Sequence, residues 1–123
     1  MEAKGLMIGD WVRNDLNQVE KVFELRETQA MLSYNDLYDY DDLEPIPLTG
    51  EILEKNRFEK QDDGWYKITL EEENLIGVQP FENVNWIFGA NVFPNIIEHL
   101  NILYVHELQH ALRLCGVEKE INL

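Results

Sequence analysis

The stretch ILYVHELQHALRLCG, residues 102–116, is the most regular part of the chain and decides its fold class. Asn101 can cap the start of a helix there, and Gly116 can end it. Between these two positions apolar residues return with the period of a helix, and they are Tyr104, Val105, Leu108, Ala111, Leu112 and Cys115. The pattern predicts a C-terminal helix from about Ile102 to Cys115, with one apolar stripe packed against a core.

The first third of the chain has the character of β-strands. Residues 8–13 open with a turn pair and continue into aromatic and β-branched residues. Residues 19–25 and 29–34 can pair as a hairpin. A helical period also fits residues 18–27, so a helix stays open there, but the β-like neighbours favour a strand.

The middle of the chain predicts a loop, a short helix and more strands. Residues 35–44 are rich in aspartate and predict an acidic loop, after which Pro45-Ile46-Pro47 keeps the backbone extended. Thr49 can cap a short helix that runs through Asn56. Further strands are expected at residues 65–70, 75–79 and 84–88, with Gly89-Ala90-Asn91 separating the last of them from residues 92–93.

These elements predict an α+β fold with a mixed or antiparallel sheet, a short middle helix and a C-terminal helix. The start Gly9-Asp10-Trp11-Val12 is seen in small SH3-like barrels, so such a barrel is an open alternative for the N-terminal part. The length of 123 residues fits a single domain, 1–123.

The charge is the unusual feature of the composition. The chain has 24 acidic and 10 basic residues, a formal net charge of −14. This balance argues against direct binding of nucleic acid or of an anionic membrane, because both need clusters of Lys and Arg. No apolar run could span a bilayer and no secretory signal is visible, and one cysteine suits a reducing cytosol. We therefore expect a cytoplasmic protein whose partner is another protein, with a basic surface.

The acidic stretch offers a surface for such a partner. It fails the pattern of a calcium-binding EF-hand, because Leu43 and Glu44 stand at positions that need a ligand and a glycine. A solvated loop is the simplest interpretation, and tyrosines interleaved with acids also suit a contact surface. The predicted partner surface consists of Asp36, Tyr38, Asp39, Tyr40, Asp41 and Asp42.

The C-terminal helix carries the only pattern that suggests metal chemistry. His106-Glu107-Leu108-Gln109-His110 matches H-E-x-x-H, in which two histidines share one helix face and bind zinc while the glutamate acts as general base. Measured against the apolar stripe, both histidines are expected on the opposite, outward face.

A catalytic zinc ion also needs a third protein ligand. The only nearby candidates are His99 and Glu118, and neither matches a known continuation of the motif. A solvated helix face is therefore favoured, with weak, adventitious metal binding by His106 and His110 next. A zinc-dependent hydrolase that uses Glu107 is the less favoured alternative. Cys115 falls on the core face, where a buried thiol is more common than a nucleophile.

Three segments together resemble a family of small uncharacterised proteins from Bacteroides-type bacteria, often associated with phage-like or mobile-element genes. The segments are Leu6–Val12, Pro45–Thr49 with Leu53 and Phe58 following, and Tyr104–Gln109. The resemblance covers most of the chain and is weakest over residues 61–100. It implies a bacterial cytoplasmic protein without an assigned activity.

This chain departs from that family at two places. Arg57 stands where the family tends to have glycine, before the position of Phe58. His106-Glu107-Leu108-Gln109-His110 stands where the family commonly has His-Gln-Leu-Gln-Asn, so metal chemistry is not implied for the family as a whole.

Three functions follow from these features, in order of preference. The first is a non-enzymatic protein-interaction module without a cofactor. The second is a zinc-dependent hydrolase built on the C-terminal helix. The third is a nucleic-acid mimic, whose carboxylates take the place of phosphates in the groove of a basic partner.

Overall fold

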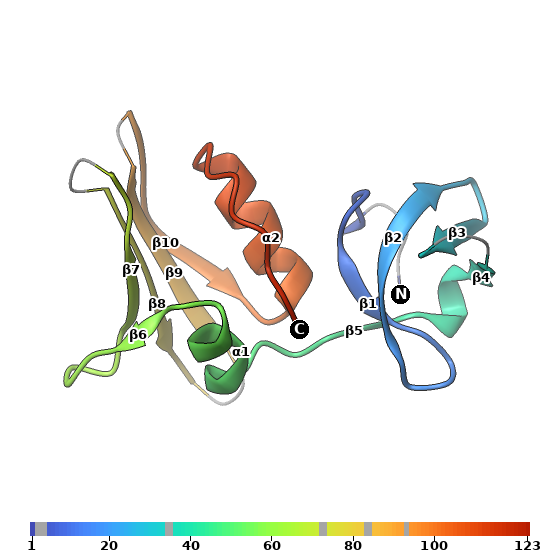
Figure 1. Cartoon of the computed structure of the whole chain (residues 1–123), viewed down its shortest axis with the longest axis horizontal. Coiled ribbons are helices and arrows are strands. Elements are labelled where there is room, and N and C mark those ends of the chain that lie inside the picture. The colour runs from blue at the N-terminus through green and yellow to red at the C-terminus, as the bar shows by residue number, and fades with distance from the viewer. Residues whose placement is uncertain (2–4, 34–35, 72–73, 83–84, 93) are drawn as a thin grey trace. The chain divides into compact units, whose positions relative to one another are not determined.

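The computed structural model describes the chain over residues 1, 5–33, 36–71, 74–82, 85–92 and 94–123. The chain divides into two compact units, Met1–Pro47 and Leu48–Leu123. Each unit contains one five-stranded antiparallel sheet (Figure 1). The α+β fold is confirmed, and the sheets are of the antiparallel kind. A single domain over 1–123 stays a prediction.

The first unit contains five strands, which are β1 (Trp11–Arg13), β2 (Val19–Leu25), β3 (Gln29–Leu32), β4 (Asp36–Asp39) and β5 (Glu44–Pro45). They lie in the order β4-β3-β2-β1-β5, and β2 is bent by a bulge between Val22 and Glu24. A 3-10 turn, Tyr40–Asp42, joins β4 to β5. The SH3-like barrel raised for the N-terminal part stays a prediction.

Strand pairing settles two questions about the first unit. Residues 19–25 are a strand and not a helix, and they form a hairpin with β3. The predicted loop over residues 35–44 is wrong, because β4 pairs with β3 and the 3-10 turn follows directly. The core of this unit consists of Leu6, Val12, Val22, Ala30, Leu32, Tyr40 and Leu43.

The second unit contains two helices and five strands, which are α1 (Gly50–Lys55), β6 (Glu59–Lys60), β7 (Tyr66–Thr69), β8 (Leu75–Pro80), β9 (Trp86–Val92), β10 (Asn95–Ile102) and α2 (Val105–Leu114). The strands follow one another in the order β10-β9-β8-β7-β6. Helix α1 packs against β6 and β7, and α2 packs against β10.

One face of this second sheet is the buried one. The pairs Ile76↔Ala90 and Val78↔Phe88 lie opposite each other in β8 and β9, and all four side chains are buried. Trp86 extends this row, and its indole Nε1 donates a hydrogen bond of 3.0 Å to the Leu48 carbonyl. The residues that alternate with them in β8 and β9 point to the opposite face of the sheet.

Two boundaries in this unit differ from the predicted ones. Gly89-Ala90-Asn91 does not end a strand, because β9 continues through it to Val92 and pairs on both sides. Helix α2 begins at Val105 rather than near Ile102, which is the buried last residue of β10. Tyr104, and not Asn101, is the N-cap residue.

Helix α1 has the predicted N-cap and an unusual C-terminal residue. The Thr49 side chain accepts a hydrogen bond of 3.3 Å from the backbone N–H of Ile52. At the other end, Phe58 N–H bonds to the Leu53 carbonyl and Arg57 N–H to the Glu54 carbonyl, which is a Schellman motif. Arg57 occupies the left-handed position of this motif with φ of 72°. A glycine before Phe58 would suit this backbone.

Arg57→Gly should therefore raise the free energy of unfolding by about 0.5–1 kcal/mol. A β-carbon in the left-handed region costs about 1–2 kcal/mol, which the glycine variant avoids. The greater freedom of glycine in the unfolded chain offsets part of this gain. Arg57 also adds to the effect of burial in lowering the pKa of Lys119, so its removal relieves a repulsion. Chemical denaturation measures the change. Gly116 holds the same position after α2 with φ of 74°, so Gly116→Ala is the control and should lower stability.

The C-terminal segment is tied to α1 by Asn56. This buried side chain donates from Nδ2 to the Asn122 carbonyl at 2.8 Å and accepts at Oδ1 from the Asn122 N–H at 2.7 Å. The same Nδ2 donates to the Ile52 carbonyl at 2.8 Å. Ile121, next to this clamp, is buried. The last residues therefore belong to the folded second unit.

Candidate functional site

The two histidines of the H-E-x-x-H pattern lie in different surroundings. His106 is only 7% exposed, and its ring stacks on Tyr104 with centroids 5.7 Å apart. His110 is partly exposed, and its ring meets His106 edge to face at 5.5 Å. The expectation that both rings face outward is therefore wrong for His106. The cause is that α2 is buried over more than one stripe, so that His106 and Gln109 are buried together with the predicted core residues Val105, Leu108, Ala111 and Leu112.

Glu107 has a structural task at the start of α2. Its Oε1 accepts hydrogen bonds from the backbone N–H of Leu103 at 2.9 Å and of Tyr104 at 3.1 Å. A carboxylate at this third helical position satisfies N–H groups that the helix leaves unpaired, and its charge suits the positive end of the helix dipole. This contact explains a glutamate here without a catalytic role.

The candidates for a third metal ligand do not join the two histidines. His99 lies on β10, where its Nε2 is 3.2 Å from Oδ1 of Asn101 and its ring lies edge-on to Phe81. Glu118 is exposed beyond the end of α2. Within the described ranges, no three His, Cys, Asp or Glu side chains gather as a metal site would require. Weak metal binding by His106 and His110 stays a prediction.

Substitutions at Glu107 separate capping from catalysis. Glu107→Gln should change the free energy of unfolding by less than about 0.5 kcal/mol, because a glutamine oxygen can accept the same two bonds, whereas Glu107→Ala should cost about 1 kcal/mol. Thermal or chemical denaturation gives both values. A hydrolase would behave differently: with added zinc, wild-type protein would cleave peptides and Glu107→Gln would not.

Cys115 is a buried core residue, as its position on the apolar stripe predicted. It is 1% exposed at the C-cap of α2. Burial raises the pKa of its thiol, which disfavours the reactive thiolate. A nucleophilic role has no support in this environment.

The predicted partner surface is partly a surface and partly core. Asp36, Asp39, Asp41 and Asp42 are exposed, and Tyr38 is half-buried on β4. Tyr40 is buried among the core residues of the first unit, and its hydroxyl donates a hydrogen bond to the Arg26 carbonyl. Tyr40 therefore has to be removed from the contact surface, because the 3-10 turn directs it inward.

Tyr38 remains beside carboxylates. The pKa of its hydroxyl is raised, first by burial and then by the negative charges of Glu20, Asp36 and Asp15. The phenol therefore stays protonated and can donate a hydrogen bond over the whole neutral range.

The exposed acids of the 3-10 turn lie beside the β1–β2 turn, whose Asp15 the sequence reasoning missed. Together they line a hollow of about 360 Å³, whose residues are Asn14, Asp15, Asn17, Asp41, Asp42 and Glu44. Four of these six side chains are carboxylates and the other two are amides. We name this the acidic hollow.

The β1–β2 turn that forms one side of the acidic hollow is built by Asn14. This side chain is buried, and its Oδ1 accepts from the backbone N–H groups of Leu16 and Gln18, both at 2.9 Å. Its Nδ2 donates to Glu20 Oε2 at 2.7 Å. Asn17 has φ of 63°, a left-handed value that asparagine tolerates well. The sequence signal for this turn was the run Asn14-Asp15-Leu16-Asn17, which is rich in residues that favour turns.

Comparison with known proteins adds no relative: no family model, no curated protein and no solved structure matches the chain. Of the helices in the described ranges, none combines the length and the apolar character that crossing a bilayer requires.

Proposed function

We propose that this protein is a non-enzymatic interaction module whose first unit binds a cationic segment of a protein partner in the acidic hollow. The observation that carries the proposal is that Asp15 from the β1–β2 turn, Asp41 and Asp42 from the 3-10 turn, and Glu44 at the start of β5 line one concave surface. Carboxylates from two separate turns focus negative potential at one place and attract Lys or Arg side chains.

The exposed predicted residues Asp36 and Asp39 extend this negative surface along β4. The formal charge of −14 adds a long-range attraction that speeds encounter with a basic partner and weakens with salt. The hydrolase alternative has less support, because Glu107 is engaged in the helix cap and the described residues supply no third metal ligand.

The setting of this function is also a proposal. A buried, unpaired cysteine is compatible with the reducing cytoplasm of a bacterium. The resemblance to Bacteroides-type proteins from phage-like or mobile elements supports a role in such an element. A basic nucleic-acid-binding protein is then the partner that the mimicry alternative requires.

A defined cationic peptide tests the acidic hollow. The variant with Asp15→Asn, Asp41→Asn, Asp42→Asn and Glu44→Gln should bind a short oligolysine peptide at least about tenfold more weakly than the wild type in calorimetry at low salt. The amides keep the size of each side chain and remove the charge that attracts the peptide.

The control for this experiment removes the same charge elsewhere. The second unit has four exposed acids that serve as the control, namely Asp62, Asp63, Glu71 and Glu118. The variant that replaces all four by Asn or Gln should bind the peptide with a Kd within about threefold of wild type, which corresponds to less than about 1 kcal/mol. If the two variants with four substitutions each lost the same peptide affinity, only the net charge would matter, and the proposed site would be abandoned.

A further inference from the structure

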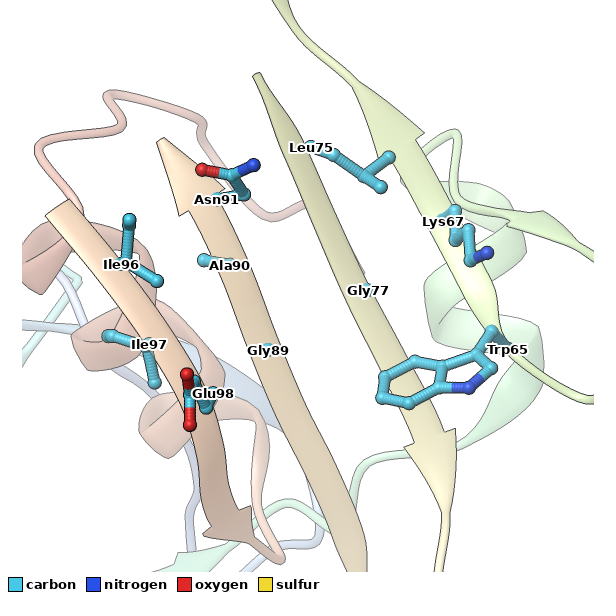
Figure 2. A pocket seen from close by; sticks show the side chains of 10 residues that line it. All are labelled: Trp65, Lys67, Leu75, Gly77, Gly89, Ala90, Asn91, Ile96, Ile97 and Glu98. Atoms are coloured by element: carbon cyan, nitrogen blue, oxygen red, sulfur yellow. The ribbon is translucent and has the colours of Figure 1, made fainter. Parts of the chain in front are cut away.

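The second unit carries a groove on the face of its sheet opposite the buried Ile76 and Val78. The groove has a volume of about 440 Å³ and crosses strands β7 to β10 (Figure 2). Its floor contains Gly77 of β8 and Gly89 of β9, which are directly paired across the two strands. Neither of these adjacent positions carries a side chain, so we name this the glycine groove.

Gly77 is explained by the tryptophan beside it. A β-carbon at Gly77 would lie 2.9 Å from Cε3 of Trp65, closer than carbon atoms approach each other. Figure 2 shows the Trp65 indole lying across β8 at this point, with its ring seen broadly face on. The missing side chain at Gly77 thus lets the indole lie down on the sheet and form one wall of the groove.

Gly89 is not explained by backbone geometry or by its neighbours. Its φ lies outside the left-handed region, and a β-carbon there would be 3.5 Å from the Glu98 carbonyl oxygen, an ordinary contact. Alanine would therefore fit, and glycine inside a strand is less stable than alanine. What glycine provides at position 89 is open space on the floor of the groove, as a closely approaching ligand requires.

The remaining lining residues indicate the chemistry of that ligand. Trp65, Leu75 and Ile96 offer apolar surface, and Ile96 is 63% exposed. Lys67, Asn91 and Glu98 lie around the margin, as Figure 2 shows. The two charges are opposite in sign, so the groove favours neither an anion nor a cation. An uncharged ring with an apolar face and hydrogen-bonding groups at its edge matches this arrangement.

We propose that the glycine groove binds a ring of a neutral saccharide, stacked on Trp65 and resting over Gly89. A pyranose presents flat C–H surface to the indole and the glycine floor, and its hydroxyls point outward to the polar margin. A plain aromatic ring would leave the marginal Asn91 and Lys67 without partners from the ligand. The groove volume lies in the range of small-ligand sites. The proposal concerns the second unit alone and does not depend on the acidic hollow of the first.

Nuclear magnetic resonance titration tests the proposal with defined probes. Cellotriose, maltotriose, mannotriose and triacetylchitotriose, all of them uncharged, are added separately to the whole protein at millimolar concentration. We expect at least one of them to shift the indole N–H signal of Trp65 and the amide signal of Gly89. The indole N–H signal of Trp86 should stay in place, because that group is buried and bonded to the Leu48 carbonyl.

Two variants make the result decisive. Gly89→Ala should keep the thermal midpoint at or above the wild-type value and raise the Kd for the saccharide at least about tenfold, because a methyl group fills the floor. Trp65→Ala should abolish binding. The proposal is overturned if none of the four saccharides shifts Trp65, if Gly89→Ala binds as tightly as wild type, or if free indole binds there more tightly than every saccharide.

Discussion

Replacing Leu108 by alanine should lower the free energy of unfolding of the second unit by about 2–5 kcal/mol, the range for emptying a packed leucine site. Leu108 is fully buried at 0% exposure in the middle of α2, beside Leu112 and Ala111 of the same helix. The loss combines the transfer of the leucine side chain out of water with the cavity that a rigid surrounding leaves behind.

Leu114→Ala is a matched control for this experiment. Leu114 belongs to the same helix but is 66% exposed, so its variant should stay within about 0.5 kcal/mol of wild type. Fluorescence in a Trp11→Phe background confines the signal to Trp65 and Trp86, both of which belong to the second unit. Equal effects at positions 108 and 114 would contradict the packing of α2 described above.

The Leu108 variant also tests the single-domain prediction. Trp11 lies in the first unit, so a background that keeps Trp11 and replaces Trp65 and Trp86 reports on that unit alone. Transitions that shift together would show one cooperative domain over residues 1–123. A shift confined to the second unit would show that the two units unfold separately.

The sequence predicted the helices and most strands because their apolar residues keep a regular period. It missed β10 because a bulge interrupts the alternation between Ile97 and Leu100. These residues pair with Ala90 and Phe88, so two successive like positions of β10 stand three residues apart instead of two. Apolar residues three positions apart do not fit the two-residue period of a strand, so the sequence did not indicate one here. Strand β4 was hidden for another reason: aspartate is rare in strands, and β4 is an edge strand that pairs only with β3.

The candidate sites were harder to predict because they depend on tertiary contacts. A helical wheel with one apolar stripe placed His106 outward, and it could not show that α2 is buried over a wider arc. The wheel also could not show that Glu107 is held by the N–H groups of Leu103 and Tyr104. The acidic hollow joins Asp15 to Asp41 and Asp42, which are far apart in sequence and become neighbours only when the sheet forms.

Ile121→Ala should lower the free energy of unfolding of the second unit by about 2–5 kcal/mol, as large a change as in the middle of a helix. Residues close to a chain end commonly fray, and their substitution then has little effect. Ile121 is only 1% exposed, and the next residue is clamped through its backbone N–H and carbonyl by the side chain of Asn56. The clamp holds the Ile121 side chain in its buried site. The segment therefore cannot avoid the loss of packing in the alanine variant by fraying.

Variants of the two asparagines test whether the clamp is what keeps Ile121 buried. Asn56→Ala removes both bonds to Asn122 and the bond to the Ile52 carbonyl, and it should cost about 1–3 kcal/mol because those backbone groups lose a buried partner. Asn122→Ala should stay within about 0.5 kcal/mol, since the bonds use its main chain and its side chain is not needed for them. Chemical denaturation of both variants and of Ile121→Ala gives the comparison. If Ile121→Ala were as mild as Asn122→Ala, the C-terminal segment would be frayed in solution and α1 would be stabilised without it.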